Sequence, residues 1–207
     1  MIKNIILYLF ICLSIACAVI IAYKRKTKKG KFLSCLILIF CAAVVLLVNI
    51  FPVENLWMKF NNPEEIIEYD KKGTADNIII GKDSCMIVYS TGNQHNGLYF
   101  APKNENNYIL PNFFTKKNIH HEFNDFGQID VYNVSGTDDY YVCAFFYRHG
   151  DTINFSDSLG SNAVVVKDEI LTDSDGIGEY FYYCLNGIPS NYSISVNGEE
   201  KFISIKE

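Results

Sequence analysis

Two long segments without a charged residue constrain this chain more than any other feature. Residues 4–23 and 32–53 contain no Lys, Arg, Asp or Glu, and they are 20 and 22 residues long. As α-helices, each would be about 30 Å long, which matches the hydrocarbon core of a bilayer. The sequence therefore predicts a two-helix transmembrane hairpin over residues 1–59. The alternative, a hairpin buried in a soluble core, would normally show a polar stripe along each helix.

The segment between these two runs sets the expected orientation. Six of the eight residues 24–31 are Lys or Arg, and short loops rich in these residues stay on the cytoplasmic side of a membrane. We therefore expect a multi-pass protein of the cell membrane, with the lipid bilayer as a partner and both termini extracytoplasmic. Whether the first span is retained or processed is left open, because Lys3 before an apolar stretch resembles a signal peptide.

Charge separates the remaining residues from the hairpin. Residues 60–207 carry ten basic and 22 acidic residues, for a net charge of −12. Such a surface repels phosphate backbones, so nucleic acid is not expected as a partner. Cations or a basic protein surface are compatible with it.

The segment after the hairpin begins with a pattern typical of a short helix. Asn62 suits the N-cap, Pro63 suits the first turn, and Glu64 and Glu65 favour the positive end of the helix dipole. From there the periodicity becomes that of strands separated by turn residues. The expected strands are residues 77–80, 84–90, 97–101, 127–134, 140–148, 162–167, 179–185, 192–196 and 201–205.

Two strand features carry most information. Asn197-Gly198 lies between two alternating runs and predicts a two-residue β-hairpin turn. Residues 140–147 are apolar or aromatic on both faces, so this strand is expected to be central and covered on each side, with residues 181–184 as its partner. We therefore predict a mainly-β extracytoplasmic domain over residues 60–207, as a sandwich or a bent antiparallel sheet.

Cysteine and histidine give little indication of a site. Three cysteines, Cys85, Cys143 and Cys184, follow the hairpin, and their odd number excludes a complete disulfide framework. Free thiols or one bridge between Cys143 and Cys184 are both compatible with the sequence. Adjacent His120 and His121 point to opposite faces of an extended chain, so they do not readily share one metal ion.

The acidic segment around residue 175 is the one candidate for a metal site. Asp173, Asp175 and Glu179 alternate with glycines as in a calcium loop, but Ile177 would occupy a ligand position and no Glu follows at the twelfth position. An acidic turn explains the same residues. No nucleophile elbow and no glycine-rich phosphate loop occur in the sequence, so we expect no catalytic residues and no cofactor.

One short stretch resembles a known group of proteins. Phe60, Pro63-Glu64-Glu65 and Tyr69, followed by the strand 85–89, are similar to the opening of uncharacterised Gram-positive membrane-anchored envelope proteins. The likeness covers about 30 residues. It implies a location in the cell envelope and a domain type, and it transfers no functional residue.

The function expected from the sequence is display of a non-catalytic binding or interaction domain on the outer face of the membrane. A possible partner is an envelope protein, and Phe113 and Phe114 are the interaction candidates unless they belong to the core. One alternative is an accessory subunit of a larger membrane complex. Another is an envelope hydrolase that would use His120, His121, Asp173 and Asp175.

Overall fold

A computed structural model describes residues 2–24, 28–70, 72–91, 94–124, 127–148, 152–168 and 177–203. The chain divides into two compact units, Met1–Met58 and Lys59–Glu207.

The first unit is a pair of helices. Helix α1 covers Ile2–Lys24 and helix α2 covers Lys28–Ile50, followed by a short 3-10 helix, η1 (Val53–Leu56). The two long helices pack against each other, and the buried Ser34 hydroxyl of α2 donates a hydrogen bond to the Ala18 carbonyl of α1 over 3.2 Å. This unit is therefore helical in the two segments where the sequence predicted helices.

The prediction that these helices cross a membrane is wrong. Among the described residues, no helix combines the length and the apolar character that a membrane span requires. Helix α2 also begins at Lys28, so the second half of the expected loop, residues 28–31, belongs to a helix. The assignments that depended on two spans are corrected with it: the transmembrane hairpin, the cytoplasmic loop, the extracytoplasmic termini and the multi-pass location in the cell membrane.

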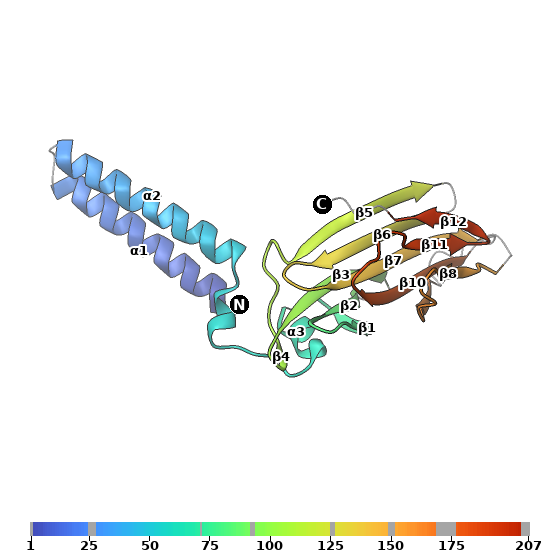
Figure 1. The fold of residues 1–207 in the computed structure, drawn as a ribbon. Coiled ribbons are helices and arrows are strands. Elements are labelled where there is room, and N and C mark those ends of the chain that lie inside the picture. Colours follow the sequence, from blue (N-terminus) through green and yellow to red (C-terminus); the bar gives the residue numbers. More distant parts are fainter. Residues whose placement is uncertain are drawn as a thin grey trace. The chain divides into compact units, whose positions relative to one another are not determined.

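In its described residues, the second unit contains one short helix and three antiparallel sheets (Figure 1). The first sheet has the order β1-β2-β3-β4, the second β5-β6-β7-β10-β9 and the third β12-β11-β8. The elements are α3 (Pro63–Asp70), β1 (Thr74–Ile80), β2 (Ser84–Thr91), β3 (Gln94–Asn104), β4 (Asn107–Tyr108), β5 (Lys116–Asn124), β6 (Gly127–Val134), β7 (Asp139–Arg148), β8 (Phe155–Asp157), β9 (Val164–Asp168), β10 (Ile177–Asn186), β11 (Ser193–Val196) and β12 (Glu199–Phe202).

The five-stranded sheet is buried on both faces. One face of β7, with Val142 and Phe146, packs with Ile194 of the three-stranded sheet and with Tyr192, which precedes β11; both are fully buried. The opposite face packs with β2 and β3 of the four-stranded sheet. The expectation of a central strand over residues 140–147 is confirmed, and β10 is its neighbour in the register Phe181↔Ala144. Because both faces need a cover, the described part of the domain has three sheets, where a sandwich or a bent antiparallel sheet was expected.

Two local predictions are confirmed by the backbone. Helix α3 begins at Pro63, and the Glu65 carboxylate accepts a hydrogen bond from the Asn61 amide over 3.1 Å. Asn197 and Gly198 have φ of 52° and 87° and connect β11 to β12. Positive φ at both central positions is the signature of the expected hairpin turn.

Three strands escaped the sequence analysis: β4, which is only two residues long, β5 and β8. Strand β5 is an edge strand with the polar sequence KKNIHHEFN and an irregularity in its pairing at Ile119, so its alternation is hidden. Strand β8 is only three residues long and pairs with β11. None of the three strands has the apolar period on which the prediction relied.

A buried carboxylate joins the first two sheets at one end of the domain. Asp139, at the start of β7, is fully buried and accepts hydrogen bonds from the backbone amides of Lys82 and Asp83 over 3.0 and 2.8 Å and from the Ser84 hydroxyl over 2.7 Å. A Cβ atom on Gly81 would lie only 2.5 Å from the Asp139 Oδ2 atom, so this close approach requires glycine. The β1–β2 turn is thus fixed to β7 through one side chain.

The three cysteines of the second unit are free thiols, so the bridge between Cys143 and Cys184 that the sequence left open is not formed. Cys85 of β2 is fully buried, and burial raises the pKa of its thiol from 9.0 to about 12. Burial likewise raises the pKa of Cys184 to about 11. These thiols stay protonated in the folded protein at neutral pH.

Replacing Asp139 tests the connection between the sheets. We expect Asp139→Ala to lower the free energy of unfolding by about 3 kcal/mol, because three partly or fully buried donors lose a charged acceptor. Asp138→Ala removes the neighbouring exposed carboxylate and is the matched control, with an expected change within about 0.5 kcal/mol. Urea unfolding at pH 7 measures both. Equal losses in the two variants would contradict the structural role of Asp139.

The buried thiol of Cys85 predicts a pH dependence of stability. Above pH 9 the unfolded thiol loses its proton while the folded thiol keeps it, so stability falls as the pH rises towards the folded pKa of about 12. Between pH 8 and pH 10, the free energy of unfolding should decrease in both proteins. We expect this decrease to be about 1 kcal/mol smaller in Cys85→Ala than in the parent chain. Ile87→Val trims the next buried side chain on the same face without removing a titrating group, and should keep the parental slope. Urea unfolding at several pH values measures the free energy of unfolding of all three proteins. The same pH dependence in all three would refute the role of the Cys85 thiol.

Candidate functional site

A partly open cavity of about 280 Å³ lies between the four-stranded and five-stranded sheets. Strands β2 and β3 supply one wall, and β6, β7 and β10 supply the other. Its lining residues are Val88, Gly97, Leu98, Gln128, Asp130, Cys143, Ala144, Phe145, Tyr180 and Tyr182.

The wall of the five-stranded sheet is built from two cross-strand rows. Asp130, Cys143 and Tyr182 are direct partners across β6, β7 and β10. In the next row, Gln128 and Tyr180 flank Phe145 in the same way. Because side chains two residues apart share a face of a strand, both rows face the same cavity. Antiparallel pairing thereby gathers residues that are more than 50 positions apart in the sequence.

Asp130 is the charged group of this wall. Its side chain is only 9% exposed. Its Oδ1 atom accepts hydrogen bonds from the Asn118 amide over 3.1 Å and lies 2.7 Å from the His121 Nδ1 atom, while the Gln128 amide donates to its Oδ2 atom. These neighbours fix the orientation of the carboxylate on the cavity wall.

Aromatic rings form the adjoining part of the wall. The Phe145 and Tyr180 rings have their centroids 4.6 Å apart, and the Tyr180 and Tyr182 rings are stacked at 6.0 Å with an angle of 8° between their planes. Val88 and Leu98 of the opposite sheet complete an apolar surface. The site therefore combines one oriented carboxylate with aromatic and aliphatic surface.

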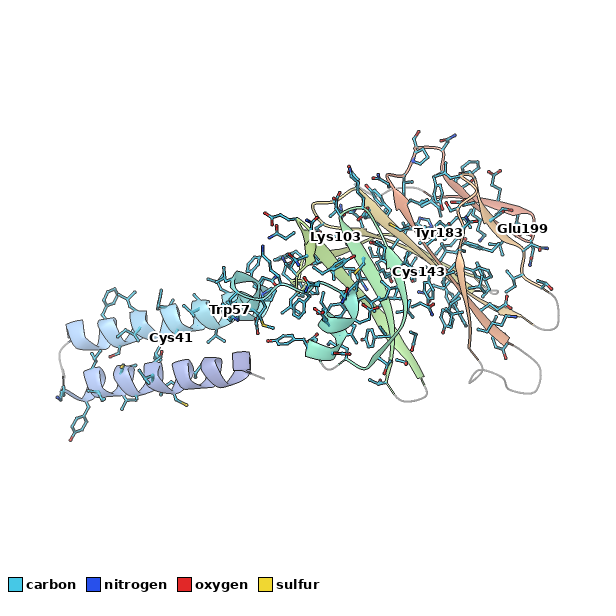
Figure 2. The ribbon with its side chains drawn as sticks, turned by 90° about the horizontal axis from the view of Figure 1, so that it is seen from below. Cys41, Trp57, Lys103, Cys143, Tyr183 and Glu199 are labelled. Carbon is cyan, nitrogen blue, oxygen red and sulfur yellow. The ribbon has the colours of Figure 1, made fainter. Side chains whose placement is uncertain are left out.

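Burial and two nearby charges shift the pKa of the Cys143 thiol, which lines the cavity. Figure 2 labels Cys143 in the interior of the second unit, among the side chains that lie between the sheets. Burial raises the pKa of this thiol, the Asp130 carboxylate raises it further, and the Lys116 ammonium lowers it by less than Asp130 raises it. Of these two charges, the Asp130 carboxylate therefore has the larger effect on the Cys143 thiol.

The predicted interaction residues Phe113 and Phe114 lie on the surface. Their side chains are 79% and 58% exposed, and their rings meet edge to face with centroids 5.3 Å apart. They precede β5 and do not line the cavity. The alternative that they belong to the core is excluded by their exposure.

The remaining sequence candidates do not form one site. Asp173 and Asp175 fall outside the described residues, whereas Glu179 is buried in β10 and pairs with Lys167 of β9 over 3.7 Å. Within the described part of the chain, no three His, Cys, Asp or Glu side chains gather in a way that could hold a metal ion. Glu179 belongs to the face of β10 opposite Tyr180 and Tyr182, so it is not part of the cavity wall.

The two adjacent histidines point away from each other, as the sequence analysis expected. His121 contacts Asp130, whereas the His120 Nε2 atom lies 3.8 Å from the Glu122 carboxylate. Glu122 in turn forms an ion pair with Lys201 of β12. His120 therefore belongs to a contact between β5 and the three-stranded sheet, separate from the cavity.

Sequence reasoning missed the cavity, although one signal was present. Asp130 and Gln128 alternate with Ile129 and Val131 in one of the expected strands. A carboxylate at an inward position of a covered sheet is costly unless it is paired or functional. The pattern could therefore have identified Asp130, but not the residues that come from β2, β3 and β10.

Comparisons with known proteins assign this chain to no family. No family model matches it, and neither a curated protein nor a solved structure matches it. The resemblance of residues 60–90 to envelope proteins stays a prediction.

Proposed function

We propose that the second unit is a non-catalytic binding domain whose cavity takes a small ligand. The observation that carries this proposal is the cavity wall, which contains the oriented Asp130 carboxylate and the Phe145 and Tyr180 rings. Ligand sites are typically concave and mostly apolar, with a few polar groups that fix orientation. The cavity has this composition.

Its size limits the ligand to a small molecule. A cavity of about 150 Å³ in another protein is enough to hold benzene, so 280 Å³ accommodates one ring with a short substituent. Drug-sized ligands occupy pockets of roughly 300 Å³ or more. We therefore expect a ligand of about one aromatic ring in size.

The state of Cys143 supports binding over covalent catalysis. A nucleophilic cysteine acts as the thiolate, which a lowered pKa favours. Burial and the Asp130 carboxylate raise the pKa of Cys143, and its thiol lies 3.4 Å from the Met86 sulfur in the core. The one sulfur nucleophile among the described lining residues is thus held in its unreactive form.

Filling the cavity tests this function. Leu98→Trp places a larger side chain on the cavity wall, and we expect it to weaken binding of benzyl alcohol and benzylammonium by about tenfold or more in ligand-observed NMR on the full-length chain. Ile80→Trp makes the same kind of change at an exposed position of β1 that does not line the cavity, and should bind as the parent does. Near-ultraviolet circular dichroism verifies that both variants are folded. Absence of binding in the parent chain, or equal binding in a folded Leu98→Trp variant, would refute the proposal.

A second candidate function is contact with a protein partner through Phe113 and Phe114. Two adjacent exposed aromatic side chains favour it, because aromatic residues are enriched among those that dominate protein interfaces. The net charge of −12 on residues 60–207 favours a partner with a basic surface. This function uses a surface outside the cavity and can coexist with ligand binding.

Paired serine substitutions separate this contact from general surface hydrophobicity. We expect Phe113→Ser with Phe114→Ser to abolish the crosslinks to a partner that in-cell crosslinking and mass spectrometry detect for the parent. Phe123→Ser with Phe202→Ser removes two other phenylalanines, which are 74% and 67% exposed, and should retain these crosslinks. If both double variants lose the partner equally, or the parent captures none above background, the Phe113–Phe114 contact is rejected.

A further inference from the structure

We propose that the ligand of the cavity is a small organic ammonium compound, with its charged nitrogen at Asp130 and its apolar body against Phe145, Tyr180 and Tyr182. This inference rests on the proposed binding function and adds the chemical class of the ligand. It predicts that anions do not bind and that neutral molecules of the same shape bind more weakly than the cation.

The first argument is the charge of the lining residues. Among the described residues that form the cavity, Asp130 is the one carboxylate and none is Lys, Arg or His. Its amide neighbours Asn118 and Gln128 donate hydrogen bonds without contributing a charge. His121, which contacts Asp130 and is a potential cation, is 57% exposed and is not a lining residue. A cation in the cavity therefore meets a carboxylate at short range and no opposing charge on the wall.

The second argument is the weak solvent screening at this carboxylate. A charge–charge interaction is several times stronger at a partly buried site than in bulk water. The Asp130 side chain is nine-tenths buried, so a neighbouring ammonium gains more there than at an exposed aspartate. A charge-assisted hydrogen bond from the ammonium is also stronger than one from a hydroxyl.

The third argument is the aromatic wall beside the carboxylate. Tyr182 lies in the same cross-strand row as Asp130, and Tyr180 stacks on Tyr182. The faces of aromatic rings carry negative partial charge and attract ammonium groups, particularly where water is excluded. The same rings provide the surface against which a hydrocarbon body of the ligand is buried.

The Lys116 ammonium, which acts on the Cys143 thiol, does not line the cavity. It lies 4.3 Å from the centre of the Tyr132 ring and 5.5 Å from that of Phe100. Its influence at Cys143 is smaller than that of Asp130. The net charge of −12 over residues 60–207 adds a long-range attraction for cations.

Three probes of nearly equal shape and different charge test the inference on the full-length chain. Benzylammonium, benzyl alcohol and benzoate share one ring and one short substituent. We expect the parent chain to bind benzylammonium about tenfold more tightly than benzyl alcohol, and benzoate not to bind, by ligand-observed NMR titration at pH 7. Equal affinity for benzylammonium and benzyl alcohol, or tighter binding of benzoate, would overturn the assignment to a cation.

Substitution of the carboxylate tests the site. Asp130→Asn keeps the size of the side chain, and we expect it to weaken benzylammonium binding by about tenfold while benzyl alcohol binding stays unchanged. Asp138→Asn removes the same charge from an exposed position outside the cavity and should leave both affinities as in the parent. Should Asp130→Asn fail to fold, Tyr180→Leu takes its place, with an expected loss for benzylammonium that exceeds the loss for benzyl alcohol.

The outcomes separate this inference from the proposed function. If benzyl alcohol and benzylammonium bind equally and both are lost in Leu98→Trp, the cavity is a binding site and the ammonium assignment falls. If no probe binds the parent chain, the proposed binding function and the ammonium assignment are both refuted. Selective binding of benzylammonium that survives in a folded Asp130→Asn variant would place the cation site elsewhere and overturn the role of Asp130.

Discussion

The burial of both faces of the five-stranded sheet is the constraint on which the second unit depends. Strand β7 presents Val142, Ala144 and Phe146 to one side and Tyr141 and Cys143 to the other, all of them buried. No single partner layer can cover both faces, so the four-stranded and three-stranded sheets pack on opposite sides. Burying apolar area at roughly 25 cal/mol per Å² is the main term that stabilises this arrangement.

The two ends of the interface between the first and second sheets differ in their polar groups. At one end, Asp139 accepts hydrogen bonds from the β1–β2 turn and holds the sheets together. Towards the other end, Asp130 lines a cavity of about 280 Å³. Both aspartates are buried, but only Asp130 faces open space. The same residue type thus serves structure at one position and, in our proposal, recognition at the other.

Pairing across strands explains why the cavity has a defined composition. The register of β6, β7 and β10 places the acidic, thiol and aromatic side chains in two rows. A shift of one residue in β6 would turn Asp130 to the other core and replace it with an apolar neighbour. The identity of the site is therefore a property of the register as much as of the residues.

The first unit shows the limit of composition as a guide. The uncharged segments predicted helices at the right places, and helices α1 and α2 are found there. The further step from an apolar helix to a membrane span is not supported within the described residues. Apolar composition predicts that a helix is buried. It does not by itself identify which surface covers that helix.

The sequence by itself determined the features that depend on a few neighbouring residues. It predicted helix α3 from its capping pattern, the Asn197-Gly198 turn from its backbone requirements, and the central position of β7 from its unbroken apolar run. These predictions succeed because the physical cause lies within about ten residues of chain. Only the tertiary structure decided the third sheet, the edge strand β5, the separate surroundings of Asp130 and Asp139, and the cavity. Each of those results from contacts between residues that are far apart in the sequence, and a local pattern carries no information about which of them meet.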